Sequence, residues 1–264
     1  VGVIGLDALR PGQTALITGS SHLLLGQSAT PVHGPGMFGS YEGGVLADGY
    51  LVEGGQASTG SITRWLKDLA NGSWFGEAVE NDVAYGKLVA EATALPRGAD
   101  GVRVLDFFQG NRTPYVDPKA RGMIWGLSLG HGPAHLFRAA LEGIAFGTEN
   151  ILRAFSAAGF RPDELVLAGG ATRNPLWLQI HADVSQLPLV VPQVPDAVAL
   201  GNAVLAAKVA GHFPDVRSAA QAMSLGTTRI EPDPDAAEVY EPLLDRYRRS
   251  YTQMRELMHE DAVG

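Results

Sequence analysis

The sequence predicts an α/β fold built on a mixed sheet, with three antiparallel strands followed by β-α units. The first third of the chain has short apolar runs separated by glycine- and serine-rich turns, which is typical of antiparallel strands. The last third alternates apolar runs with helical patterns across short loops, which is typical of parallel strands covered by helices. A long helical pattern joins the two parts.

The composition excludes several classes of protein. The chain has 264 residues, 45% of them hydrophobic, which is enough for a substantial core. Its net charge of −8 argues against nucleic acid or an anionic membrane as the main partner. There is no cysteine, which excludes disulfides and agrees with the cytoplasmic location that we expect. No apolar run is long enough to predict a membrane span, and residues 1–9 lack the pattern of a signal peptide.

The three antiparallel strands are expected in the first third of the chain. Residues 14–28 contain two apolar runs on either side of a Gly-Ser-Ser turn, which predicts a hairpin. Residues 49–52 form the third strand, which ends at a pair of glycines. Apolar residues recur at three- and four-residue spacing over 62–69, which predicts a helix with Ser58 or Thr59 as its N-cap.

Residues 71–133 are less regular, and we expect them to form an insertion. Their pattern predicts, in order, a helix at 82–93, a loop at 95–101, a short strand at 102–108 and a polar loop at 109–122.

The longest helical pattern of the chain follows, at 135–159. Gly143 and Gly147 lie inside it and predict close packing against a neighbouring element, because a glycine within a helix otherwise costs about 1 kcal/mol. Glu149 and Arg153 are four residues apart and are expected to pair on the face opposite the apolar stripe.

The last third predicts two β-α units and a final helix. The expected elements are a strand at 164–170, a helix at 174–186, a strand at 188–192, a helix at 197–211 and a helix at 235–259. Taken with the three antiparallel strands, this is the ribonuclease-H-like order found in half of an actin-like ATPase, and it fits one domain over 1–264.

Two glycine-containing turns are candidate binding elements. In LVLAGGATRNPLW a buried strand runs into Gly169 and Gly170, and a helix begins near Asn174, so a flat ligand could lie on bare backbone beside a polar amide. The alternative is an ordinary strand-to-helix turn with a capping Asn. In ITGSSHL the turn at Ser20 and Ser21 offers hydroxyls and amides that suit phosphate, and the alternative is a polar hairpin turn.

Other types of site lack their motifs. There is no Walker loop and no G-x-G-x-x-G after a strand, which excludes a P-loop NTPase and a Rossmann dehydrogenase. His131 and His135 have helical spacing, but a Gly-Pro pair separates them, so no metal site is expected. His181 is expected to be an ordinary packed or surface residue. No G-x-S-x-G elbow supports a hydrolase at Ser20 or Ser21.

One segment, GMIWGLSLGHGPAHLFRAALE at residues 122–142, constrains many positions at once. It resembles the C-terminal signature of the FGGY carbohydrate kinases. Residues 95–101, 107–122, 169–184 and 196–207 resemble other motifs of that family, so the resemblance runs along nearly the whole chain.

The resemblance implies a nucleotide site on this chain, with ATP and with Mg²⁺ bound mainly through the nucleotide. It places phosphate contacts at the Gly19 turn and adenosine contacts near the start of the helix at 62–69 and after the strand at 164–170. The candidate nucleotide-binding residues are Gly19, Ser20, Ser21, Gly60, Arg64, Gly169, Gly170 and Asn174.

The chain departs from the pattern of the family at four of the matched positions. Ser20 replaces Thr and keeps its hydroxyl, His22 stands near a usual Gly, and Arg64 replaces a Gln of some members. Asn111 replaces the commoner Glu and leans toward the ribulokinase-like branch.

The resemblance also implies a reaction. A sugar or polyol hydroxyl, most simply that of a pentulose, would attack the γ-phosphate of Mg-ATP while a carboxylate takes the proton. Family members carry that Asp just before a stretch that resembles VGVIGL, so the general base is expected upstream of Val1, and Asp7 follows the stretch instead. The chain would then be the nucleotide-binding half of the enzyme, inactive without the N-terminal, sugar-binding domain.

Two other functions stay open. The chain could be a stand-alone actin-like module that binds nucleotide or a protein partner without kinase activity. A relative of acetate kinase or hexokinase is the third alternative, and the 122–142 segment argues against it. The partners that we expect are ATP or ADP, a small sugar or polyol, the N-terminal domain and, at most, a second copy in a homodimer.

Overall fold

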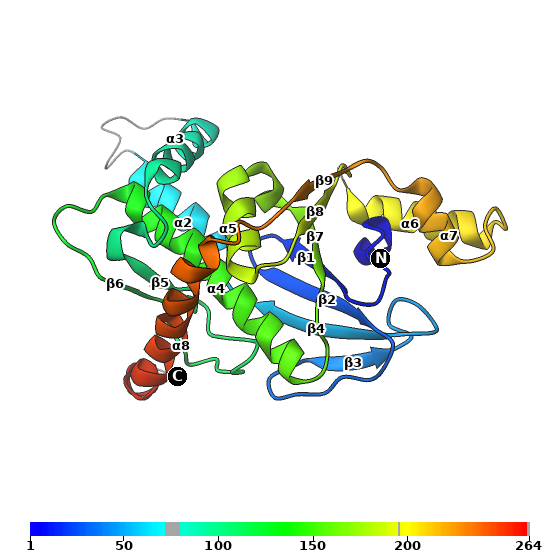
Figure 1. The fold of residues 1–264 in the computed structure, drawn as a ribbon, viewed down its shortest axis with the longest axis horizontal. Helices are drawn as coiled ribbons and strands as arrows, with labels where there is room; N and C mark the ends of the chain where they lie inside the picture. The colour runs from blue at the N-terminus through cyan, green and yellow to red at the C-terminus, as the bar shows by residue number, and fades with distance from the viewer. Residues whose placement is uncertain (72–79, 195, 263–264) are drawn as a thin grey trace.

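A seven-stranded mixed sheet lies at the centre of the fold, with helices on both of its faces (Figure 1). The computed structural model of the chain describes residues 1–71, 80–194 and 196–262. Within these residues the strand order is β3-β4-β2-β1-β7-β8-β9, and β5 and β6 form a separate two-stranded ribbon. β1 and β7 come from distant parts of the sequence and are parallel neighbours in the middle of the sheet. The predicted α/β fold with a mixed sheet is therefore confirmed.

The first half of the sheet is antiparallel, as predicted. Its strands are β1 (Gln13–Thr18), β2 (His22–Ser28), β3 (Gly39–Glu42) and β4 (Tyr50–Gln56). β1 is almost continuously buried because helices cover both of its faces, whereas β2 alternates between buried and half-buried residues. The sequence predicted three of these strands and missed β3, a short edge strand of mostly polar residues that pairs only with β4.

A less regular region separates the two halves of the sheet. It contains α2 (Gly60–Ala70), α3 (Asn81–Ala94), a 3₁₀ turn (Ala99–Gly101), β5 (Arg103–Leu105) and β6 (Met123–Trp125). α3 matches the predicted helix, whereas β5 keeps only three of the seven residues predicted as strand. Residues 72–79 of the predicted insertion lie outside the described residues. α3 packs on the long helix that follows, where the Tyr85 and Phe137 rings meet edge to face at 5.4 Å.

The long helix α4 (Pro133–Ala157) confirms the expectation of close packing at its glycines. A Cβ on Gly143 would overlap the backbone oxygen of Val104 in β5. A Cβ on Gly147 would overlap the Gln56 side chain and come within 2.9 Å of a carboxylate oxygen of Asp106. Glycine therefore lets β4, β5 and the segment after β5 lie directly against α4.

The Glu149–Arg153 pair forms, but its predicted placement was wrong. Arg153 Nε donates to Glu149 at 2.7 Å, and Arg153 also pairs with Glu241 of the last helix. Glu149 is buried rather than on an outer face, since α4 is packed on several sides. Burial raises the pKa of Glu149 to about 7, despite the neighbouring guanidinium.

The second half of the sheet follows the predicted β-α order. Its elements are β7 (Glu164–Gly169), a 3₁₀ turn (Gly170–Arg173), α5 (Pro175–Ser185), β8 (Leu189–Pro192), α6 (Ala197–Val209), α7 (Val216–Met223) and β9 (Thr227–Ile230). The sequence did not predict α7 or β9. β9 is antiparallel to β8 and closes that edge of the sheet.

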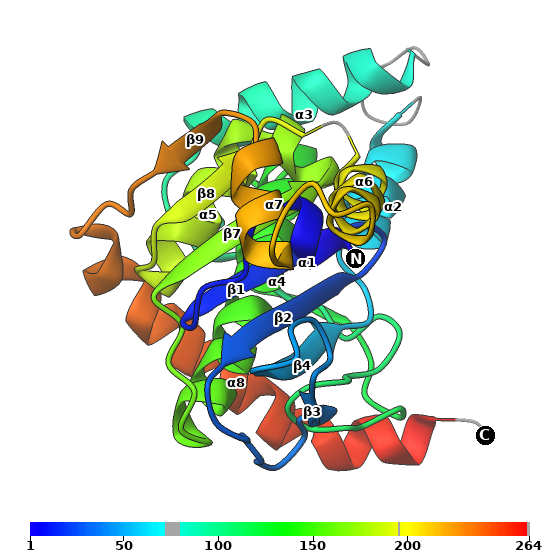
Figure 2. The same ribbon diagram turned by 90° about the vertical axis from the view of Figure 1, so that its right-hand side faces the viewer.

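Two hydrophobic clusters lie on opposite faces of the sheet. One contains side chains of α2, α3, α4, α5 and the last helix, and the other contains side chains of α6, α7 and the short helix α1 (Gly2–Gly5). Figure 2 shows α1, α6 and α7 gathered on one side of the sheet, with α4 and α8 on the other. Ala15 and Val166 of the central strands belong to the second cluster, while Leu16 and Leu167 belong to the first.

The final helix α8 (Ala236–Asp261) confirms the prediction for this region and is held by three buried tyrosines. Tyr240 donates to Glu142, Tyr247 to Asp106 and Tyr251 to Asp117. The rest of α8 is largely polar and exposed. Within the part of the chain that the structure describes, no helix combines the length and the apolar character that crossing a membrane would require.

Candidate functional site

Three of the predicted segments meet at one edge of the sheet. Thr18 at the end of β1 lies opposite Gly169 at the end of β7, so the turn after β1 and the turn after β7 leave the sheet side by side. α2 begins at the same place, where Gly60 N donates to Gly19 O at 3.2 Å and Thr59 N donates to Ser20 O at 2.9 Å. This edge holds the carboxyl ends of two parallel strands, where ligands bind in open α/β sheets.

The four glycines of this edge are present for different reasons. A Cβ on Gly60 would overlap Gly19 O, and Gly169 has φ +103° with its Cβ position against Thr18 O, so backbone packing requires both glycines. A Cβ on Gly19 would lie 3.8 Å from its nearest neighbour, and a Cβ on Gly170 would meet no atom of the described residues within 4 Å. Gly19 and Gly170 are exposed, so they present bare backbone that the fold itself does not demand.

The turn between β1 and β2 keeps several polar groups free. Gly19 N donates to Ser21 O at 2.9 Å, so the Gly19 amide is occupied inside the turn. The amides and hydroxyls of Ser20 and Ser21 donate to no other described residue, and Ser20 is exposed. The groups that could meet phosphate oxygens are therefore those of Ser20 and Ser21 rather than the amide of Gly19.

Asn174 lies at the start of α5 and performs the predicted capping role. Its Oδ1 accepts from Trp177 N at 3.1 Å, and Pro175 occupies the first helical position. The side chain is buried, and its Nδ2 has no hydrogen-bond partner among the residues that the structure describes. An unpartnered buried donor usually costs about 1–3 kcal/mol, so one polar atom of Asn174 is left without an explanation in the fold.

Arg64 is not brought into this group. It lies on the exposed face of α2, its side chain is 80% exposed, and its ion pair is with Asp68 on the same helix at 4.0 Å. The structure thus brings together the turn at 19–21, the start of α2 and residues 169–174, and leaves Arg64 in solvent beside them.

The sequence analysis missed a buried polar network behind this edge. Thr148 of α4 donates to Gln56 Oε1 at 2.8 Å, and Gln56 Nε2 donates to Asp106 Oδ2 at 2.9 Å. His22 Nδ1 lies 3.5 Å from Thr148 Oγ1, which joins the residue after the turn to the same network. Burial raises the pKa of Asp106 to about 6, although Tyr247 and Gln56 both donate to it. The only sign of this network in the sequence was His22, which stands near a position where the family usually has Gly.

His181 is a packed residue, one of the two placements expected for it. It is buried, and this burial lowers its pKa to about 3. The rings of His131 and His135 lie 5.0 Å apart, and His135 Nε2 is 3.3 Å from Asp100. Among residues 1–71, 80–194 and 196–262, no group of three or more His, Asp or Glu side chains is arranged to hold a metal ion.

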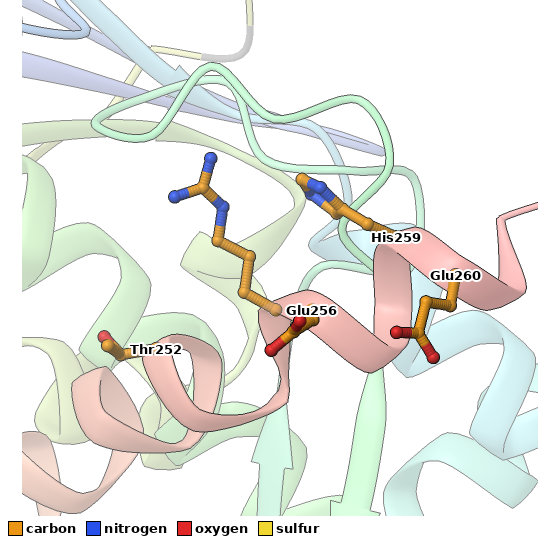
Figure 3. A pocket seen from close by; sticks show the side chains of 5 residues that line it. Thr252, Glu256, His259 and Glu260 are labelled. Carbon is orange, nitrogen blue, oxygen red and sulfur yellow. The ribbon is translucent and has the colours of Figure 1, made fainter.

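A cavity of about 540 Å³ lies elsewhere, along α8 (Figure 3). Its lining residues are Thr252, Arg255, Glu256, His259 and Glu260. They belong to one face of a solvent-exposed helix and carry both signs of charge. None of the predicted nucleotide-binding residues lines this cavity, so it gives no support to the predicted site.

Comparison with known sequences decides the family. The sequence model of the FGGY family of carbohydrate kinases, C-terminal domain, matches residues 14–210. The chain belongs to this family. The matched range includes every candidate nucleotide-binding residue and the segment at 122–142, which forms β6, the following loop and the first turns of α4.

Relatives of this FGGY chain are sugar kinases about twice its length. The ribulokinase of Bacillus licheniformis is 32% identical over 262 residues, which cover 96% of this chain and 47% of the ribulokinase. The FGGY carbohydrate kinase domain-containing protein of Homo sapiens is 32% identical over 258 residues, covering 85% of this chain and 45% of the human protein. The crystal structure of xylulose kinase from Rhodospirillum rubrum superposes with a TM-score of 0.84 at 30% identity, over 98% of this chain and 50% of the kinase.

These comparisons confirm the fold class and the family of this FGGY chain. Its relatives by sequence include ribulokinases. Its structural neighbours, among them the xylulose kinase, have the actin-like, ribonuclease-H-like fold that the element order predicted. The chain spans about half the length of the curated relatives it matches. It matches the C-terminal domain of the family, whose members are carbohydrate kinases.

Proposed function

We propose that this chain is the nucleotide-binding half of an ATP-dependent carbohydrate kinase and holds ATP or ADP at the carboxyl ends of β1 and β7. The observation that supports the proposal most strongly is the bare backbone of Gly19 and Gly170, which face solvent at this edge without any packing reason. Amides and hydroxyls hold phosphate without Lys or Arg, which suits a chain of net charge −8.

The proposal assigns each group a role. Ser20 and Ser21, with the Gly19 turn, would meet the phosphates, because their amides and hydroxyls donate to no group in the described part of the chain. The ribose and adenine would lie along Gly169 and Gly170, next to Asn174 and beside the start of α2 at Gly60. Arg64 would be an outer contact that reaches in from the exposed face of α2.

Mg²⁺ would enter with the nucleotide. The described residues that form this edge offer hydroxyls, amides and carbonyls, and no carboxylate cluster suited to a dedicated cation site. Phosphate oxygens are the ligands that Mg²⁺ most often shares in kinases. Bound there, the ion would neutralise charge on the phosphates during transfer.

The acceptor is proposed to be a pentulose, with a polyol or a sugar acid as the alternative. Ribulokinases among the relatives and the similarity to a xylulose kinase structure support a ketopentose. The general base and most sugar contacts would come from the half of the enzyme that the longer relatives have in addition. The chain alone, given ketopentoses and Mg-ATP, should therefore release no more ADP than a buffer blank, and measurable turnover would contradict this division of roles.

Calorimetric titration with Mg-ADP tests the nucleotide site. The chain should bind ADP, and Gly170→Leu should weaken binding at least about tenfold, because a side chain there would occupy the ligand position. Asn174→Ser keeps an N-cap oxygen and removes the unpartnered Nδ2, so it should also weaken binding while unfolding like the parent chain.

Gly86→Leu on α3 is the matched control. Gly86 is exposed, and a Cβ there meets no described atom within 4 Å, as at Gly170, yet it lies on a different element. This variant should bind ADP like the parent chain. Two results would contradict the nucleotide site at this edge: no heat of binding at millimolar ADP, or equal ADP binding by the Gly170, Asn174 and Gly86 variants. Either result would favour a module without a nucleotide site here.

A further inference from the structure

His22, the residue that follows the Gly19–Ser21 turn, packs against side chains of α5. His22 is completely buried at the start of β2, and its ring stacks on Trp177 with centroids 5.6 Å apart and an interplanar angle of 29°. The same ring lies 5.4 Å from that of His181. Trp177 and His181 are one helical turn apart on α5, with their rings stacked at 6.0 Å and 22°.

His22 is also tied to the elements behind it. Its Nδ1 lies 3.5 Å from Thr148 Oγ1, at the long end of the hydrogen-bond range. Thr148 donates in turn to Gln56 Oε1 at 2.8 Å, and Gln56 stands opposite His22 in the register of β2 and β4. The imidazole is thus held between α5 on one side and α4 with β4 on the other.

This arrangement links the two parts of the proposed nucleotide site. Asn174, on the adenosine side, accepts a hydrogen bond from the backbone of Trp177, so the ring that stacks on His22 belongs to the residue that Asn174 caps. The turn on the phosphate side leads directly into His22. The stack therefore connects the residue after the phosphate-side turn with the helical turn that Asn174 caps.

The three stacked rings contain buried polar atoms that packing alone does not require. The Nε2 atoms of His22 and His181 and the Nε1 of Trp177 are buried and have no hydrogen-bond partner among the described residues. A leucine would fill the same space without a ring and without leaving polar atoms unpaired. Local departures from good packing chemistry concentrate at functional sites, where positioning matters more than stability.

We propose that His22 is a positioning residue for nucleotide binding, which holds the phosphate-side turn at a fixed spacing from Asn174 through its stack on Trp177 and His181. The inference rests on the proposed function. Its physical basis is preorganisation: a turn that is already in place loses less conformational freedom when the phosphates bind. A positioning role of this kind should matter for ligands that touch both sides of the site, and little for those that touch one.

The test compares ADP with adenosine, each titrated by NMR into the parent chain and its variants. His22→Ala removes the ring and should weaken ADP binding about tenfold. It should leave adenosine binding within about threefold of the parent value, because adenosine has no phosphate to place at the turn. His22→Phe keeps the stack and should retain most of the affinity for ADP.

Two further variants keep the test decisive. Leu24→Ala truncates a completely buried side chain on the same strand and the same face, and it should lower stability without changing the ratio of the two affinities. His22→Leu fills the buried volume and replaces His22→Ala should that variant fail to fold. It should show the same selective loss of ADP binding.

The outcomes separate this inference from the function it rests on. If the parent chain binds no ADP, the proposed function falls, and the positioning role falls with it. If the parent chain binds ADP but the His22 variants bind it equally well, or lose ADP and adenosine in the same proportion, only the positioning role is overturned.

Discussion

The role of Asn174 could be predicted from the sequence, whereas that of His22 could not. The N-cap role of Asn174 was predictable, because Asn followed by Pro at the start of a helical pattern is a local signal that needs no distant partner. The stack of His22 was not predictable, because Thr148 and His181 are brought to it by the fold from 126 and 159 positions away. A ligand contact by Asn174 stays a prediction.

The buried histidines make a prediction about acid stability. Burial lowers the pKa of His181 to about 3, so its imidazole stays neutral in the folded chain at pH 5. In the unfolded chain it binds a proton below about pH 6.5, so acidification favours unfolding from pH 6.5 downward. His181→Phe should reduce this loss of unfolding free energy by about 1.4 kcal/mol per pH unit between pH 6 and pH 4.5.

Urea unfolding of the parent and the variant at several pH values measures the difference. Three buried carboxyls act in the opposite direction, since burial raises the pKa of Asp106 to about 6, that of Glu149 to about 7 and that of Glu142. His22 acts in the same direction as His181, because burial lowers its pKa. All four groups are present in the two proteins, so their effects cancel in the comparison. Parallel pH profiles for the two proteins would show that His181 is not held neutral by the fold.

At the scale of elements, the glycines of α4 were more informative than its apolar stripe. A glycine inside a helix lowers stability unless it serves packing, and this cost alone predicted that α4 has a close neighbour at Gly143 and Gly147. The apolar stripe did not predict that Glu149 is buried, because an argument from periodicity assumes that the face opposite the stripe contacts solvent. α4 is packed on several sides, so the assumption did not hold.

Two glycine-to-alanine substitutions test the packing of α4. At Gly86 in α3 the added Cβ meets nothing within 4 Å, so Gly86→Ala should stabilise the chain by about 0.5–1 kcal/mol through helix propensity. At Gly147 the added Cβ overlaps the Gln56 side chain, so Gly147→Ala should destabilise the chain by about 1–3 kcal/mol. Urea unfolding gives both values, and a Gly147 variant as stable as the parent would contradict the packing described.

The elements that the sequence analysis missed share a physical cause. β3 and β9 are short, lie at the edges of the sheet and consist largely of exposed residues. Their backbone pairing with β4 and β8 stabilises them, and no apolar alternation reports it. α7 has eight residues, and a helix of this length is marginal by itself, so it depends on the packing of Ala219 and Ala220 in the second hydrophobic cluster.

At the scale of the whole molecule, the order of elements predicted the fold, whereas the site depends on one long-range pairing. β1 and β7 are about 150 residues apart in sequence and run parallel, and this places Thr18 opposite Gly169. Each glycine-containing turn was ambiguous when considered alone. From the family resemblance we expected the two turns to lie together. The register of β1 and β7 explains why they do.

The most direct test of the nucleotide site is hydrogen–deuterium exchange of the chain with and without saturating Mg-ADP. The account predicts slower exchange in three separate segments at once, residues 18–22, 59–61 and 169–175, with residues 252–260 along the α8 cavity unchanged. Protection that is absent from these three segments, or that appears only along α8, would contradict the claim that the carboxyl ends of β1 and β7 hold the nucleotide.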